Sequence, residues 1–187
     1  MLKPKNFEQV QSYGVFIPLE TGGHICRIMK VEESKSITGK EMVTVYLDTD
    51  ITDIQPNYYS NMYKEDIRTD KKWSNNSVKR LFVYDYNGNT DRRFKTFIEC
   101  VQDSNKGFEV QWNDKFENCF KGKLVGGVFG REEYENQNGE KKFAVKIQNF
   151  RTIQDVKKGI VKVPKDKLLN SSNDEELVPD NFGQMPF

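Results

Sequence analysis

The stretch from residue 123 to 153, KLVGGVFGREEYENQNGEKKFAVKIQNFRTI, constrains the fold more than any other part of the chain. Apolar and polar residues alternate along its second half, which is typical of a β-strand. Asn138-Gly139 is a strong short-range signal for a hairpin turn. The stretch therefore predicts two antiparallel strands, and the glycines at 126, 127 and 130 would let the first strand bend as a barrel corner requires.

Three more strands are expected before this hairpin. Residues 24–32 (HICRIMKVE) are apolar enough for one strand, and a loop containing Gly39 leads to the next, 42–49 (MVTVYLDT). Strict alternation along 42–49 predicts a half-buried strand with one apolar face. Residues 80–86 (RLFVYDY) predict a third strand, which the turn Asn87–Asn89 ends.

One helix is predicted between the third strand and the hairpin. Thr90 or Asp91 can cap its start, and Gly107 can stop it. Its core face is given by apolar residues at helical spacing, namely Phe94, Phe97, Ile98 and Val101. Residues 108–112 (FEVQW) could add a short strand.

The order of three strands, a helix and a two-stranded hairpin predicts a mainly β fold. It fits an OB-fold, a five-stranded Greek-key barrel with one helix between strands 3 and 4. An α+β sandwich is the alternative. We expect this domain to span residues 1–168, followed by a disordered, flexible acidic tail at 169–187.

The charges are unevenly divided between these two parts. The last 18 residues hold four of the 28 acidic residues and neither Lys nor Arg. The remainder therefore holds 24 acidic and 29 basic residues, a net charge of about +5. A basic body with an acidic tail favours a nucleic-acid partner, although solvated surface charge would look the same.

Other classes of protein are disfavoured. No stretch is long and apolar enough to span a membrane, and no signal peptide is recognisable. Three cysteines without metal-like spacing favour a reducing compartment. The motifs of phosphate loops, zinc proteases and serine hydrolases are absent. Acidic residues that could in principle hold a metal (Asp48, Asp50, Glu132, Glu133 and Glu135) read better as solvated charge. We therefore expect no enzymatic activity, no metal and no cofactor.

The most informative stretch for function is YYSNMYKEDIRTDKKW, residues 58–73. It mixes aromatic and basic residues, as single-strand binders do, because aromatic faces stack bases and cations follow the phosphates. The candidate contacts here are Tyr58, Tyr59, Tyr63, Lys64, Arg68, Lys71, Lys72 and Trp73. We expect about half of the aromatic residues to belong to the core instead.

Four further candidates lie on the predicted strands. Alternation places Tyr46, Lys146 and Phe150 on the outward side of their strands, which can form the binding face of an OB barrel. Arg80, at the start of the third strand, completes the set of candidate contacts.

Two segments resemble a known family. Residues 22–48, GGHICRIMKVEESKSITGKEMVTVYLD, and the hairpin stretch 123–153 are similar to small single-stranded DNA-binding proteins in the replication modules of phages and mobile elements of low-GC Gram-positive bacteria. The resemblance spans roughly residues 7 to 168, and GREEYE…NGE…F is its most specific part. It implies an OB-type fold, sequence-independent binding of single-stranded DNA in replication or recombination, and a place in the bacterial cytoplasm.

Other functions stay open at this point. A recombination mediator or a single-strand annealing factor could share this pattern, and OB-type modules also bind proteins or oligosaccharides. The sequence also leaves open whether the chain forms a homo-oligomer.

The end of the chain carries a second resemblance. Bacterial single-stranded DNA-binding proteins end in an acidic tip that closes on Pro-Phe, and Pro186 and Phe187 match it, with Asp180 upstream. The resemblance implies that the tail binds replication or recombination proteins. Gly183, Gln184 and Met185 depart from the acidic residues that usually precede the terminus.

Overall fold

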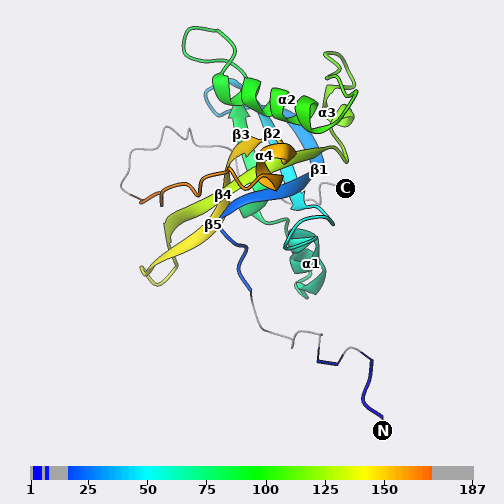
Figure 1. Cartoon of the computed structure of the whole chain (residues 1–187). Coiled ribbons are helices and arrows are strands. Elements are labelled where there is room, and N and C mark those ends of the chain that lie inside the picture. Colours follow the sequence, from blue (N-terminus) through cyan, green and yellow to red (C-terminus); the bar gives the residue numbers. More distant parts are fainter. Residues whose placement is uncertain (1, 6, 9–16, 170–187) are drawn as a thin grey trace.

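The computed structural model describes residues 2–5, 7–8 and 17–169 of the 187-residue chain. Within them the protein is mainly β, as predicted, with one five-stranded antiparallel sheet (Figure 1). The strands are β1 (Gly22–Lys35), β2 (Glu41–Thr49), β3 (Val78–Phe82), β4 (Leu124–Glu135) and β5 (Lys141–Arg151). The helices are α1 (Tyr58–Glu65), the 3-10 turn η1 (Asn75–Ser77), α2 (Arg92–Ser104), α3 (Phe116–Cys119) and α4 (Ile153–Lys157).

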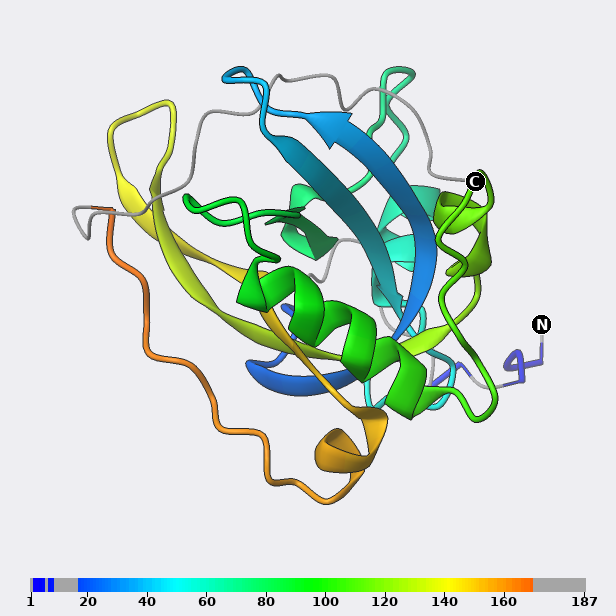
Figure 2. The same ribbon diagram turned by 90° about the horizontal axis from the view of Figure 1, so that it is seen from above.

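The strand order is β3-β2-β1-β4-β5, with β1 at the centre. The first part of β1 pairs with β4, and most of its length from Cys26 onward pairs with β2. A register shift between Ile28 and Lys30 interrupts the pairing with β2. Such a bulge increases the local twist and bend, and the sheet is strongly curved (Figure 2). The hydrogen-bonded sheet is open, because β3 and β5 are its two edges.

Helix α2 confirms the predicted helix between the third and fourth strands. The Asp91 side chain accepts a hydrogen bond from the Arg93 backbone amide and so caps its start, as expected. All four predicted core residues of α2 are buried: Phe94, Phe97, Ile98 and Val101. The Phe97 ring lies 4.9 Å from that of Phe150, between ring centroids, and α2 contacts both edge strands.

The predicted hairpin is also confirmed, as β4 and β5. Gly139 has a φ of +76°, in the left-handed region that favours glycine, and its amide donates to the Asn136 carbonyl. The glycines of β4 allow close packing: a Cβ on Gly126 would lie 2.8 Å from the Arg151 carbonyl oxygen, and one on Gly127 would lie 2.8 Å from Cys26 Sγ. Larger residues there would force the strands apart.

Three local predictions are wrong. The third strand was predicted at 80–86, but β3 spans Val78–Phe82 and residues 83–86 lie beyond it. Strand β2 was expected to be half-buried, but it is buried on both faces from residue 42 to its end at Thr49. Residues 108–112 form no strand. Instead they run as an irregular segment toward α3, and Trp112 is exposed.

The segment 53–79 contains α1, which its weak periodicity did not predict. Asp48 at the end of β2 explains why a helix begins there. Its fully buried carboxylate accepts hydrogen bonds from the backbone amides of Tyr59 and Ser60, in the first turn of α1. A side chain from another element therefore satisfies amides that a helix start leaves unpaired.

Candidate nucleic-acid interface

The aromatic and basic stretch 58–73 contributes two of its four aromatic residues to the core. Tyr59 is only 2% exposed, and its ring stacks on Phe129 with 6.3 Å between centroids. Trp73 is 6% exposed, and its Nε1 donates to Ser77 Oγ over 2.8 Å. Both side chains hold α1 and the following loop in place, so neither presents a free face to a base.

The other two aromatic residues of the stretch are half-buried. Tyr58 packs edge-on against Tyr59, and burial raises its pKa. The Tyr63 ring already has a cation over it, because Lys71 Nζ lies 4.6 Å from its centroid. Tyr63 is thus the aromatic residue of this stretch whose partly exposed ring could stack a nucleic-acid base next to a cation.

The exposed basic residues of this stretch are Lys64, Arg68 and Lys72. Arg68 is engaged locally, since its Nη2 donates to Asp66 Oδ2 over 2.6 Å. That hydrogen bond is the main reason that the pKa of Asp66 falls to about 2. Stretch 58–73 therefore presents mainly separate exposed cations, and few free aromatic faces, to a nucleic-acid strand.

The prediction that Tyr46 and Phe150 lie on an exposed face is wrong, because both side chains are buried. The Tyr46 hydroxyl donates to Glu32 Oε2 over 2.7 Å, and burial, together with this hydrogen bond, raises the pKa of Tyr46. Phe150 is buried against Phe97 because the register shifts between β4 and β5 next to Gln148. A bulge adds one residue to a strand and so reverses the inside–outside alternation beyond it.

The last two strand candidates are half-buried. Lys146 Nζ lies 3.4 Å from Glu132 Oε2, an ion pair across β4 and β5. Arg80, on β3, lies opposite Thr44 of β2. Its positive charge acts to lower the pKa of Tyr46, against the larger effects that raise it. Tyr46 and Arg80 are therefore two predicted residues that the structure brings near each other.

A different surface combines cations and exposed aromatic rings. Two hollows meet at the first turn of α2, and both are lined by Arg92 and Arg93. The first, of about 180 Å³, lies between α2 and the edges of β3 and β5; the second, of about 600 Å³, extends over the turn after β3. We call the two hollows together the α2 groove. Its charged lining residues are Lys40, Lys79, Arg92, Arg93 and Arg151, with Asp85 and Asp91.

Both carboxylates of the α2 groove are engaged within the protein. Asp85 Oδ1 accepts hydrogen bonds from the backbone amides of Asn87 and Asn89 and holds their turn. Asp91 caps α2 and also accepts from the Arg93 guanidinium. Partial burial raises the pKa of Asp91, but the hydrogen bonds from Arg93 outweigh it and hold this pKa below its usual range. The α2 groove consequently has an excess of positive charge.

Two aromatic residues of the α2 groove are accessible, whereas Phe150, which also lines it, is buried. Tyr86 is 85% exposed and Tyr84 48% exposed, on the turn that Asp85 holds. Lys40 Nζ lies 4.8 Å from the centroid of Tyr86 and 5.7 Å from that of Phe82. Aromatic faces beside cations suit the bases and phosphates of a single strand.

Of the predicted contacts only Phe150 lines this groove, and sequence reasoning missed the rest of it. A signal was present in YDYNGNTDRR, residues 84–93, where two tyrosines and two arginines flank a tight turn. Its other cations come from residues 40, 79 and 151, so only the folded chain brings them together.

Four of the acidic residues considered for a metal have partners within the protein, among them Glu133, whose Oε2 lies 3.7 Å from Lys141 Nζ. Asp48 caps α1, and Asp50 accepts from the amide and hydroxyl of Thr52. Glu132 pairs with Lys146 and Lys167. Among the residues that the structure describes, no three potential metal ligands converge.

Two further predictions concern the tail and membranes. Asp180, Pro186 and Phe187 lie outside the described residues, as does nearly all of the predicted tail. Within the part of the chain that is described, no helix has both the length and the apolar character needed to cross a membrane.

Comparison with known proteins adds no relative to this picture: no family model matches the chain, and no curated protein matches it in sequence.

Proposed function

We propose that this chain is a non-enzymatic protein that binds single-stranded DNA without regard to sequence. The observation that carries the proposal is the α2 groove, which joins five cationic side chains to the exposed rings of Tyr84 and Tyr86. Bases would stack on the two rings while phosphates lie near Arg92 and Arg151. Stacking contributes roughly 1–3 kcal/mol per base and does not depend on which base it is.

We further propose that the curved sheet is an OB-type barrel. The order β3-β2-β1-β4-β5, a central β1 shared by two neighbours and a helix in contact with both edge strands support this fold. In an OB barrel the first and last strands of this order come together and close it. OB barrels commonly hold single strands along a positively charged groove.

The biological setting is proposed from the resemblance in sequence. The protein would act in the replication or recombination of a phage or mobile element, in the cytoplasm of the bacterial host. The acidic tail, through Asp180, Pro186 and Phe187, would bind replication or recombination proteins.

A fluorescence titration with an oligo-dT strand at several salt concentrations tests the DNA-binding proposal. Phosphate contacts release counterions, so log K should fall linearly with log salt, with a slope of about −0.7 per contact for a single strand. We expect clear preference for the single strand over a duplex of the same length. Absence of binding at low salt, or equal affinity for duplex, would overturn the proposal.

A further inference from the structure

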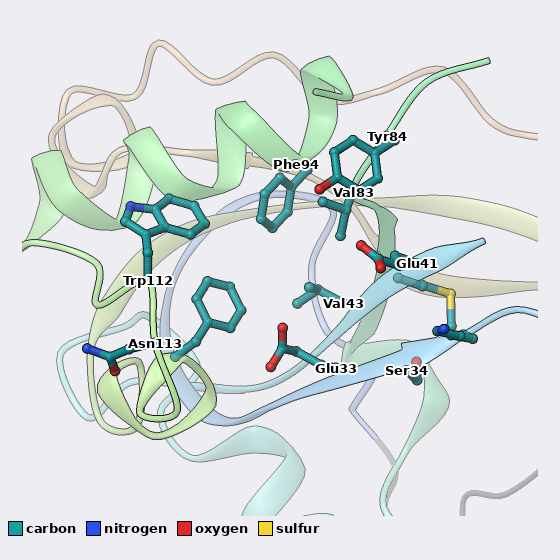
Figure 3. A pocket seen from close by; sticks show the side chains of 12 residues that line it. Glu33, Ser34, Glu41, Val43, Val83, Tyr84, Phe94, Trp112 and Asn113 are labelled. Carbon is teal, nitrogen blue, oxygen red and sulfur yellow. The ribbon is translucent and has the colours of Figure 1, made fainter. Parts of the chain in front are cut away.

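A larger hollow lies next to the α2 groove (Figure 3). It is enclosed by the end of β1, the start of β2, the first turn of α2 and the segment before α3. We call it the Trp112 pocket. Its volume is about 690 Å³, within the range of roughly 300–1,000 Å³ that small-molecule sites occupy. Tyr84 lines both the Trp112 pocket and the α2 groove, so the two hollows are adjacent.

The indole of Trp112 is 67% exposed but firmly supported. It stacks on Phe116, with 5.5 Å between ring centroids and 26° between planes. The Phe94 ring meets it edge-on at 6.3 Å. Phe116 and Phe94 are themselves buried, so they fix the indole while much of its surface stays in contact with solvent. A rigid exposed indole is suited to stack a planar ring.

Two carboxylates lie across the hollow from these aromatic rings. Figure 3 shows Glu33 and Glu41 rising from the two strands, opposite Phe94 and Trp112. Both side chains are exposed, and Lys35 is the cationic residue that lines the pocket with them. Carboxylates repel phosphate, so a strand would enter the Trp112 pocket with a base and leave its phosphates over the α2 groove.

We infer that the Trp112 pocket receives one unstacked base of the bound strand and favours a base with an exocyclic amino group. This inference rests on the proposed function. The base would stack on Trp112 and donate its amino hydrogens to Glu33 or Glu41, as the N4 amino group of cytosine does to carboxylates elsewhere. Thymine has two carbonyl oxygens on either side of its single N3–H, and the carboxylates repel those oxygens, so thymine binds more weakly than cytosine. Binding is therefore tolerant of sequence along the strand but selective at this one position.

A basic protein segment is the rival occupant, because carboxylates beside aromatic rings also suit an arginine. The shared Tyr84 favours the base, since it places the Trp112 pocket directly beside the cationic surface that would carry the strand.

The test measures the affinities of the full chain for labelled dC and dT strands of equal length, by fluorescence anisotropy at one low salt concentration. The wild type should bind dC about fivefold more tightly, at the lower end of the discrimination that a good base contact supplies. In Glu33→Gln/Glu41→Gln the ratio should fall toward one, because an amide can also donate to thymine. Glu135→Gln, an exposed position in the β4–β5 hairpin, is the control and should keep the ratio. Trp112→Ala should weaken binding to both strands, on the order of tenfold.

The outcomes separate this inference from the proposed function. Two results would overturn the inferred base preference of the Trp112 pocket: equal affinity of the wild type for dC and dT, or a dC-to-dT ratio that the double substitution does not change. In either case, salt-dependent binding of dT would still support the proposed function. If neither strand binds, both fail. A Trp73→Phe variant leaves Trp112 as the sole indole of the chain. If its emission responds to a tetra-arginine peptide and not to dC, the occupant is a basic protein segment and the inference is overturned.

Discussion

His24 and Asp53 form a buried pair, with 2.8 Å between His24 Nδ1 and Asp53 Oδ1. The other ring nitrogen, Nε2, lies 3.0 Å from the carbonyl oxygen of Glu20. Asp53 and the Glu20 carbonyl are both hydrogen-bond acceptors, so the ring is held from two sides. The pair joins the start of β1 to the loop after β2, which gives the single histidine a structural place inside the protein.

We expect His24→Ala to lower the free energy of unfolding by about 3–5 kcal/mol, because it leaves the Asp53 carboxylate buried without its partner. Urea unfolding at neutral pH measures the change. The double variant His24→Ala/Asp53→Ala should lose less than the sum of the two single changes, since the two side chains interact directly. Additive losses would show that the pair contributes nothing beyond its packing.

Stability should also fall in acid. Burial raises the pKa of Asp53, but hydrogen bonds from His24 and from the backbone of Gln55 and Ile25 outweigh it, so the folded-state pKa lies below the usual value. Such a carboxyl contributes stability fully above its unfolded pKa of about 3.9 and loses it as pH falls through the folded value. Urea unfolding at pH values from neutral down to about 3 should show this loss, and Asp53→Asn should flatten the curve in that window.

Removing cations from the α2 groove should weaken DNA binding mainly at low salt. Arg92→Gln and Arg151→Gln should each reduce the magnitude of the salt slope by about 0.7 if each arginine contacts one phosphate. Lys106→Gln is a matched control, because Lys106 is exposed just beyond the other end of α2. If the control changes the slope as much as Arg92→Gln does, the groove is not the binding surface.

Two aromatic substitutions should have opposite effects. Trp73→Ala should cost about 3–5 kcal/mol of stability, since it empties a buried site and removes the hydrogen bond to Ser77. Tyr86→Ala should leave the melting temperature nearly unchanged and weaken binding of a dT strand by roughly 1–3 kcal/mol. Thermal unfolding and DNA titration of both variants test this. If Trp73→Ala weakens DNA binding without loss of stability and Tyr86→Ala does not weaken it, the binding site lies in stretch 58–73 instead.

The acidic tail should compete with DNA for the cations of the body. Its four carboxylates are tethered to the domain, so their effective concentration near the α2 groove is high. Deleting residues 170–187 should raise DNA affinity, most clearly at low salt, where charges are least screened. Deleting only Pro186 and Phe187 should leave DNA affinity unchanged and weaken capture of a replication partner. The idea of two separate tail functions fails if both truncations behave alike in both assays.

Local pattern alone determined the most regular elements of this protein. Strand alternation with Asn138-Gly139 predicted β4 and β5, and helical spacing after Asp91 predicted α2. These signals work because a strand face repeats every two residues, a helix face repeats at three or four, and caps and turns involve only neighbouring residues.

Tertiary structure decided which aromatic and basic residues reach the surface. Asp48 of β2 accepts a hydrogen bond from the first turn of α1 and so fixes where this helix begins. Tyr59, in the same turn, is buried as a result. Gln148 is the extra residue of a bulge in β5, and it turns Phe150 inward. The α2 groove joins residues as distant as Lys40, Arg92 and Arg151. Burial and charge clustering depend on pairings between segments far apart in sequence, and no local periodicity records those pairings.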